Sequence, residues 1–257
     1  MRLDSTRLAA AILGGFVASL ALGVAQGALW VSEKEIERRY RVEWLSMKKH
    51  MPIVQDERVN RYVRCVANDI VKTLDEQYQA LNWEVIVFDD AAQNAQVMPG
   101  GKVAIYSGIL DVADTPDALA AVIGHEAAHL TQGHVIERER RAAQSEALTM
   151  IGNAATGLGG MVSDATMLAF MLPFTREQET EADAVGMHYM SVAGYDPRSV
   201  FYLWKGMAAD DDSRPAEFAS THPAPDTRMA DLVPHLTQAL TEYNHARESG
   251  VRPHCGN

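Results

Sequence analysis

Two histidines flank a glutamate in the pentapeptide His125-Glu126-Ala127-Ala128-His129. On an α-helix, residues four apart lie on one face, so the imidazoles of His125 and His129 can point at one metal ion. Neutral imidazole is a good zinc ligand. Glu126 lies roughly 100° around the helix from His125, so it reaches a metal-bound water more easily than the metal itself. The motif therefore predicts a zinc site in which Glu126 is the general base and later protonates the leaving amine.

The alternative is a surface helix that carries two histidines by chance. The motif follows an apolar stretch with helical periodicity, Ala118–Ile123, which favours a packed helix instead.

A catalytic zinc ion usually has three protein ligands and one water. A metzincin would take its third ligand from a histidine at position 135, after a glycine at 132. Gln132 and Val135 stand there, so that class is excluded. His134 is one position out of register, and we interpret it as a surface histidine or as one that contacts a ligand.

A better source of the third ligand is the acidic segment 176–183, in which three glutamates alternate. Helical geometry puts Glu179 and Asp183 on a small, apolar face that suits packing against the HEAAH helix. Glu177 and Glu181 fall on a more polar face that we expect to be solvated. We therefore predict that Glu179 is the third ligand. Asp183 would accept a hydrogen bond from the free nitrogen of a ligating histidine.

Another histidine, His222, precedes Pro223 in the segment STHP, and Arg228 follows shortly after. A histidine held before a proline can be kept rigidly at a site. His222 could be a fourth metal ligand, or it could stabilise the oxyanion of the transition state. A purely structural role in a loop fits these residues equally well, so its role stays open at this point.

Several elements must position these residues, and together they predict an α+β fold. We expect it to be mainly helical, with a small β-sheet beside the HEAAH helix. In chain order, the patterns predict helices within 33–81 with a break at Pro52, strands at Trp83–Phe88, Asn94–Val97 and Lys102–Ser107 with Pro99-Gly100-Gly101 as a turn, a helix from Thr115–Asp117 through HEAAH, and helices at Arg176–Ala193, after Pro197 and at Asp226–Glu248.

The segment 142–174 has no Lys or Arg and contains a cluster of glycines before the apolar run Met167–Phe174. It is interpreted either as a core helical hairpin or as a mobile flap near the active site. Its apolar pieces are too short and interrupted to predict a membrane span.

The composition is that of a globular protein: 257 residues, of which 47% are hydrophobic and 22% charged. A formal net charge of -11 repels phosphate backbones, which argues against a nucleic-acid partner. The sequence has no GxSxG motif, and its glycine cluster at 157–160 lacks the Gly-Lys-Ser/Thr of a phosphate loop. The oligomeric state stays open.

The N-terminus differs from the rest of the chain. Arg2 and Arg7 precede an uncharged, mostly apolar run. Residues 1–31 are predicted to be either a signal peptide cleaved after Ala25-Gln26-Gly27 or an anchor that spans the bilayer over Leu8–Val31. In both cases the rest of the chain would lie outside the cytoplasm. We expect an exported protein, either periplasmic or attached through this segment to the outer face of the inner membrane.

The two cysteines, Cys65 and Cys255, lack the spacing of a zinc or redox motif. Outside the cytoplasm two thiols tend to pair. We hypothesise a disulfide that ties the C-terminal tail to an early helix, and two free thiols are the alternative.

Taken together, HEAAH, the ExxxD pair Glu179 and Asp183, the STHP segment and Arg228 resemble the HtpX and CAAX prenyl endopeptidase family of gluzincins, which are zinc metallopeptidases. Within it the chain is similar to compact members: exported bacterial proteases and the catalytic core of the mitochondrial Oma-type proteases. The resemblance runs from about Asn60 to Leu236. Met98, before the Pro-Gly-Gly turn, and the cysteine-bearing tail depart from the family pattern without touching the ligand set.

The resemblance implies that His125, His129 and Glu179 bind one Zn²⁺ per chain and that Glu126 is the catalytic base. It also implies that His222 can sit at the zinc and block or modulate the site. The strand at about Lys102–Ser107 would be the edge to which an extended substrate peptide adds.

The residues and the resemblance predict that 32–257 is a zinc metalloendopeptidase domain acting on protein or peptide substrates. The resemblance alone adds unfolded or misassembled cell-envelope proteins as the substrate class. One rival is a chaperone-like binding protein whose protease site is closed by His222 and the segment 142–174. A structural zinc protein is another, but structural sites usually have four protein ligands and need no general base.

Overall fold

The computed structural model describes residues 31–156, 173–209, 222 and 228–255. The chain divides into two compact units, one made of Glu37–Val135 and Pro173–Asn257, the other of Met1–Ile36 and Ile136–Leu172. The first unit contains every predicted site residue. Except for Val31, the predicted signal or anchor lies outside the described residues. Among the helices that are described, none is long and apolar enough to cross a bilayer.

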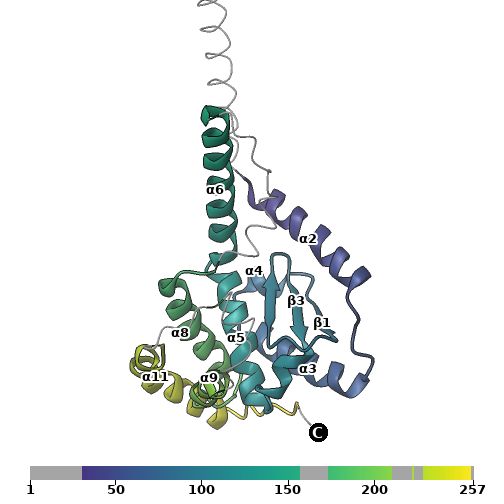
Figure 1. Ribbon diagram of the computed structural model, residues 1–257. Helices are drawn as coiled ribbons and strands as arrows, with labels where there is room; N and C mark the ends of the chain where they lie inside the picture. Colours follow the sequence, from purple (N-terminus) through teal and green to yellow (C-terminus); the bar gives the residue numbers. More distant parts are fainter. Residues whose placement is uncertain (1–30, 157–172, 210–221, 223–227, 256–257) are drawn as a thin grey trace, which may run out of the picture. The chain divides into compact units, whose positions relative to one another are not determined.

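The described elements confirm an α+β fold that is mostly helical (Figure 1). In chain order they are α2 (Glu33–His50), α3 (Glu57–Val71), α4 (Glu76–Gln79), β1 (Glu84–Phe88), β2 (Ala95–Met98), β3 (Lys102–Tyr106), the 3₁₀ helix η1 (Ser107–Asp111), α5 (Pro116–Thr131), α6 (His134–Thr156), α8 (Arg176–Val192), α9 (Ser199–Ala209) and α11 (Arg228–Glu248).

Most predicted elements are confirmed, with small shifts at their ends. Ser107 begins η1 rather than ending β3. The helix expected to reach position 81 ends at Val71, because Thr73 bonds the Ile70 carbonyl oxygen through both its amide, at 2.9 Å, and its hydroxyl, at 2.7 Å. Within the segment 142–174, residues 142–156 continue α6, and 157–172 lie outside the described residues.

The sheet has the strand order β1-β3-β2, so β3 is its central strand. It pairs in parallel with β1 and antiparallel with β2. The prediction that the strand at Lys102–Ser107 is a free edge is therefore wrong. The turn through Gly100 and Gly101, both with positive φ, folds β2 back onto one side of β3, and β1 takes the other side. The edge beside the HEAAH helix is β2.

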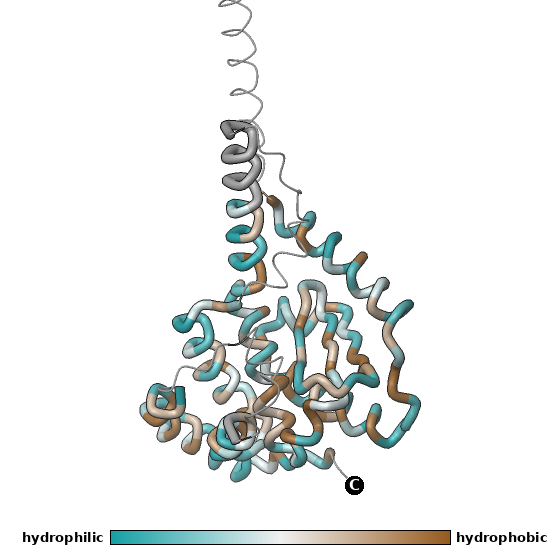
Figure 2. The backbone as a smooth tube through the Cα atoms, viewed as in Figure 1, coloured by the Kyte–Doolittle hydropathy of each residue, from teal (hydrophilic) through white to brown (hydrophobic). Residues whose placement is uncertain are grey.

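Helix α5, which carries the HEAAH motif, is the centre of the core. All residues from Ala118 to Leu130 are buried, and the helix lies between the sheet and α8 (Figure 1). Its start is as predicted, with Pro116 in the first turn and the Thr115 hydroxyl accepting a hydrogen bond from the Ala118 amide at 3.2 Å. In Figure 2 the hydrophobic residues gather where α5 meets its neighbours. A fully buried side chain such as Leu119 stabilises the fold by about 1.5–3 kcal/mol.

Two glycines let α5 and α8 approach until their backbones touch. A Cβ atom on Gly124 would lie 2.8 Å from the carbonyl oxygen of Gly186, and one on Gly186 would lie 2.7 Å from the His125 amide nitrogen. No real side chain fits at either position. This close crossing brings the start of α8, with Glu179 and Asp183, beside the first histidine of the motif.

The hypothesis of a disulfide is confirmed. Cys65 on α3 is bonded to Cys255, with their Cα atoms 5.6 Å apart. The bond ties the tail that follows α11 to the helix that packs against α5.

Candidate metal centre

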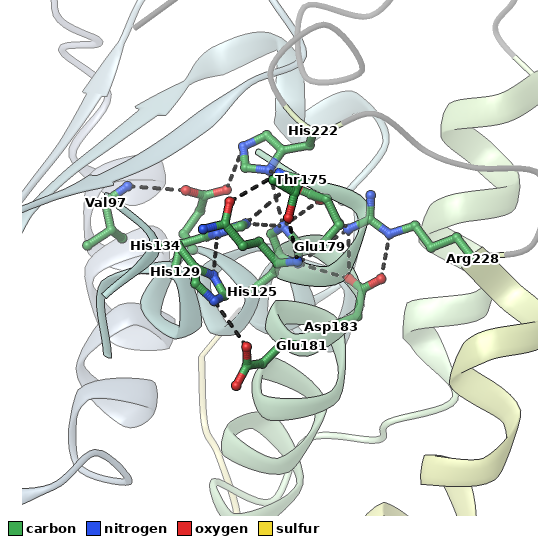
Figure 3. A network of polar contacts seen from close by, with 12 residues as sticks. Val97, His125, His129, His134, Thr175, Glu179, Glu181, Asp183, His222 and Arg228 are labelled. Carbon is green, nitrogen blue, oxygen red and sulfur yellow. Dashed lines mark hydrogen bonds and ion pairs between the residues drawn. The ribbon is translucent and has the colours of Figure 1, made fainter. Parts of the chain in front are cut away.

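His125 and His129 lie one helical turn apart on α5, and their Nε2 atoms are 3.1 Å from each other (Figure 3). Both side chains are buried. The prediction that i,i+4 spacing aims both imidazoles at one point is confirmed as geometry.

Glu179 reaches the same point from α8. Its Oε1 lies 3.4 Å from His129 Nε2, and its Oε2 lies 3.5 Å from His125 Nε2. The side chain has no solvent exposure. Burial alone would raise the pKa of Glu179, but the surrounding imidazoles of His125, His129 and His222 outweigh it and hold this pKa far below its ordinary value. The carboxylate is therefore ionised and available to a cation.

The structure also brings His222 into this group. Its Nδ1 lies 3.0 Å from Glu179 Oε1 and 3.2 Å from His125 Nε2. Its Nε2 lies 3.3 Å from Glu126 Oε1. One donor atom from each of His125, His129, Glu179 and His222 lies within 4.8 Å of all the others.

These donor atoms fit a small tetrahedral metal ion. Bonds of about 2.0–2.1 Å put the ligand atoms of a tetrahedral site on the order of 3.3 Å apart. The distances between the imidazole and carboxylate atoms, from 3.0 to 3.5 Å, bracket that value. Lone pairs of imidazole nitrogens and carboxylate oxygens point at one another here. They repel each other unless a cation or protons lie between them. Without a metal, burial lowers the pKa of His125, but Asp183 and Glu179 outweigh burial and raise it to about 9.

Glu126 lies beside the group and touches the sheet edge. Its Oε2 accepts a hydrogen bond from the amide of Val97 on β2, at 3.3 Å. The carboxylate is thus held between the edge strand and the candidate ligands, as the predicted role of a base requires.

Asp183 supports His125 from behind, as predicted. Its Oδ1 lies 2.9 Å from His125 Nδ1, and a carboxylate can only accept, so His125 donates. Arg228 donates to both Asp183 oxygens, with Nη2 2.7 Å from Oδ1. The same Nη2 lies 3.1 Å from Glu179 Oε2, and the guanidinium stacks 3.5 Å over the ring of Trp204. Burial raises the pKa of Asp183, but the charge of Arg228 outweighs it and the net shift is downward.

His134 is not a surface residue, so that part of its interpretation is wrong. In agreement with the other part, it contacts the predicted ligand His129. It is buried, and its Nδ1 lies 3.0 Å from Nδ1 of His129. Glu177 and Glu181 are exposed, as predicted.

The ring of Phe174 stacks on the ring of His129 with centroids 3.8 Å apart. Neither Phe174 nor Trp204 carried a signal in the sequence that pointed to the site.

Comparison with known proteins agrees with this geometry. Residues 57–235 match the family described as Peptidase family M48, and this range contains all the predicted site residues. The chain is similar to the mitochondrial metalloendopeptidase OMA1 of Schizosaccharomyces pombe, with 36% identity over 162 residues, which are 62% of this chain and 48% of that protein.

It is also similar to the beta-barrel assembly-enhancing protease of Escherichia coli, with 30% identity over 193 residues, 70% of this chain and 39% of that protein. For the protease of the same name from Yersinia pestis the identity is 27% over 223 residues, 78% of this chain and 45% of that protein. The chain thus spans about half the length of these relatives or less.

Proposed function

The chain belongs to peptidase family M48, and from that premise we propose that it is a zinc-dependent metalloendopeptidase, with residues 32–257 as the peptidase domain. The observation that carries the proposal is the buried group of His125, His129 and Glu179 with the carboxylate of Glu126 beside it. Three protein ligands and an adjacent base are what metal-assisted hydrolysis needs.

We assign zinc to His125, His129 and Glu179. When bound, zinc supplies a Lewis acid that polarises the peptide carbonyl and lowers the pKa of the attacking water. Glu126 takes a proton from that water and passes it to the leaving amine. The hydrogen bond from Val97 keeps the Glu126 carboxylate in place between these two transfers.

We assign the substrate to the outer edge of β2. The amide of Tyr106 donates to the Asn94 carbonyl, so Asn94 faces β3, and with the register of the pair Gln96 and Met98 face it as well. Strand alternation then turns the backbone groups of Ala95 and Val97 outward, beside Glu126. The Ala95 amide donates to Asn94 Oδ1 and the Val97 amide to Glu126, so the carbonyl oxygens of these two residues are the groups that would pair with a substrate backbone. An extended peptide that pairs with this edge passes its backbone in front of the base.

An edge that accepts an extended backbone suits unfolded segments, so we propose unfolded or misassembled cell-envelope proteins as substrates. The apolar N-terminal run supports export, with the protein periplasmic or attached through 1–31 to the outer face of the inner membrane. The names of the Escherichia coli and Yersinia pestis relatives, which refer to β-barrel assembly, fit this setting.

Metal removal tests the proposal. We expect the full chain to cleave casein, to lose this activity in the chelator 1,10-phenanthroline, and to regain it on addition of zinc but not of magnesium or calcium, because imidazole ligands disfavour those ions. Peptide products are counted by mass spectrometry. Cleavage that persists in the metal-depleted protein would contradict a metallopeptidase.

His222 adds a fourth donor atom to the group, and with zinc bound it would occupy the position that water and substrate need. We therefore expect His222→Ala to raise the initial rate of casein cleavage several-fold. The exposed His235 on α11 provides a control, and His235→Ala should leave the rate unchanged. A lower rate in His222→Ala would show that His222 assists the reaction. Casein binding without cleavage would favour the chaperone-like alternative.

A further inference from the structure

The second histidine of the motif has a buried neighbour that the proposed reaction does not use. His134 packs against His129 with ring centroids 5.1 Å apart, and their Nδ1 atoms are 3.0 Å apart. On its other side, His134 Nε2 lies 3.3 Å from Oε2 of Glu181, a carboxylate that is 54% exposed (Figure 3). The three residues thus form a row from the candidate metal site to the surface.

The end of α5 explains why His134 lies there. The helix stops at Thr131, and Gly133 has φ 75°, a conformation that L side chains rarely adopt. The amide of Gly133 donates to the Leu130 carbonyl at 3.2 Å, which closes the turn. The chain therefore leaves the path of α5 at Gly133, and His134, which follows at once, lies on the Nδ1 side of His129.

The positions of the hydrogens follow from the contacts. His129 faces the other donors through Nε2, so its neutral ring carries hydrogen on Nδ1 when Nε2 is a ligand. That N–H points at Nδ1 of His134, which must then accept. The hydrogen of His134 is consequently on Nε2, where the Glu181 carboxylate accepts it.

The other histidine of the motif provides an internal comparison. His125 donates from the same ring atom, Nδ1, directly to the buried carboxylate of Asp183. His129 instead directs its Nδ1 at Nδ1 of His134, and the other ring nitrogen of His134 meets the Glu181 carboxylate. Glu181 lies on the opposite face of α8 from Asp183.

We propose that His134 is a positioning residue that connects the metal ligand His129 to Glu181 through two hydrogen bonds, Glu181···His134···His129. The connection fixes the ring of His129 and lets a negative charge at the surface increase the basicity of its Nε2. The proposal rests on the zinc site of the proposed function, and it concerns how tightly that site holds the metal.

The test measures zinc affinity by competition with a chelator of known affinity, in the full-length chain. We expect His134→Ala to weaken zinc binding by about ten- to a hundredfold, the usual effect of removing a hydrogen-bond partner of a ligand. His134→Gln should restore most of the affinity, because its amide can accept from His129 and donate to Glu181. Glu181→Gln should weaken binding by a smaller factor, and Glu177→Gln, at another exposed position on α8, should not change it.

A second measurement determines which ring nitrogen of each histidine carries hydrogen. In ¹⁵N spectra of the histidine rings we expect hydrogen on Nδ1 of zinc-bound His129 and on Nε2 of His134, a pattern that a merely space-filling His134 does not require. Wild-type zinc affinity in both His134→Ala and Glu181→Gln would overturn the proposal, as would hydrogen on Nδ1 of His134.

If His134→Ala fails to fold, the test rests on Glu181→Gln, which changes an exposed residue. Reduced zinc affinity in this variant supports the connection, and unchanged zinc affinity overturns it. Wild-type protein that binds no zinc would overturn the proposed function as well. Tight zinc binding that none of these variants alters would overturn only the role of His134.

Discussion

Glu126→Gln is expected to slow casein cleavage by about a hundred- to ten-thousandfold, the usual contribution of a general base, while zinc stays bound. Glutamine has the shape of glutamate, and its amide oxygen can still accept the hydrogen bond from Val97 that Glu126 Oε2 accepts at 3.3 Å. It cannot take a proton from water. Glu126 is also absent from the group of candidate metal ligands, so the substitution leaves their geometry unchanged.

The measurement compares initial rates of casein cleavage at equal zinc content, determined by elemental analysis. Glu177→Gln is the matched control, because it makes the same chemical change at an exposed position and should leave the rate unaltered. Equal rates for wild type and Glu126→Gln would show that the base is assigned wrongly or that a contaminant cleaves casein. A loss of zinc in Glu126→Gln would instead indicate that the carboxylate helps to hold the metal.

The site residues that could be predicted from the sequence are those whose relative positions are set by the periodicity of a single helix. His125 and His129 are one turn apart, and so are Glu179 and Asp183, so each pair must share a face wherever its helix packs. The small and apolar neighbours of Glu179 identified the buried face of α8, while Glu177 and Glu181 fell on the exposed one. Such arguments need no knowledge of the partner helix.

The parts that could not be predicted depend on contacts between distant segments. The place of β3 at the centre of the sheet depends on which side β1 occupies, and neither strand's composition encodes that choice. The burial of His134 follows from the turn at Gly133, and the position of Trp204 under Arg228 follows from a contact between α9 and the first residue of α11. The close crossing at Gly124 and Gly186 lets α5 and α8 pack against each other. In the sequence, each glycine predicts only a weaker helix and not this contact.

Asp183→Asn should cause the largest loss of stability among these variants, about 3–5 kcal/mol in the free energy of unfolding. Asp183 and Arg228 are both buried and joined by two hydrogen bonds. Asparagine removes the negative charge and leaves the guanidinium inside the protein, where Glu179 and the ring of Trp204 compensate it only in part. The value is measured by urea unfolding of the metal-free protein.

An exposed ion pair provides the control. Glu57 pairs with Arg64 on α3, where the side chain of Glu57 is 62% exposed and that of Arg64 43%, so Glu57→Gln should change stability by about 1 kcal/mol or less. The double variant Asp183→Asn, Arg228→Leu should be more stable than Asp183→Asn alone, since the buried guanidinium that lost Asp183 is removed and Glu179 keeps its imidazole partners. If Asp183→Asn unfolds at the wild-type urea concentration, the pair does not stabilise the fold. Its remaining role would then be to orient His125, and weaker zinc binding in the same variant would measure that role.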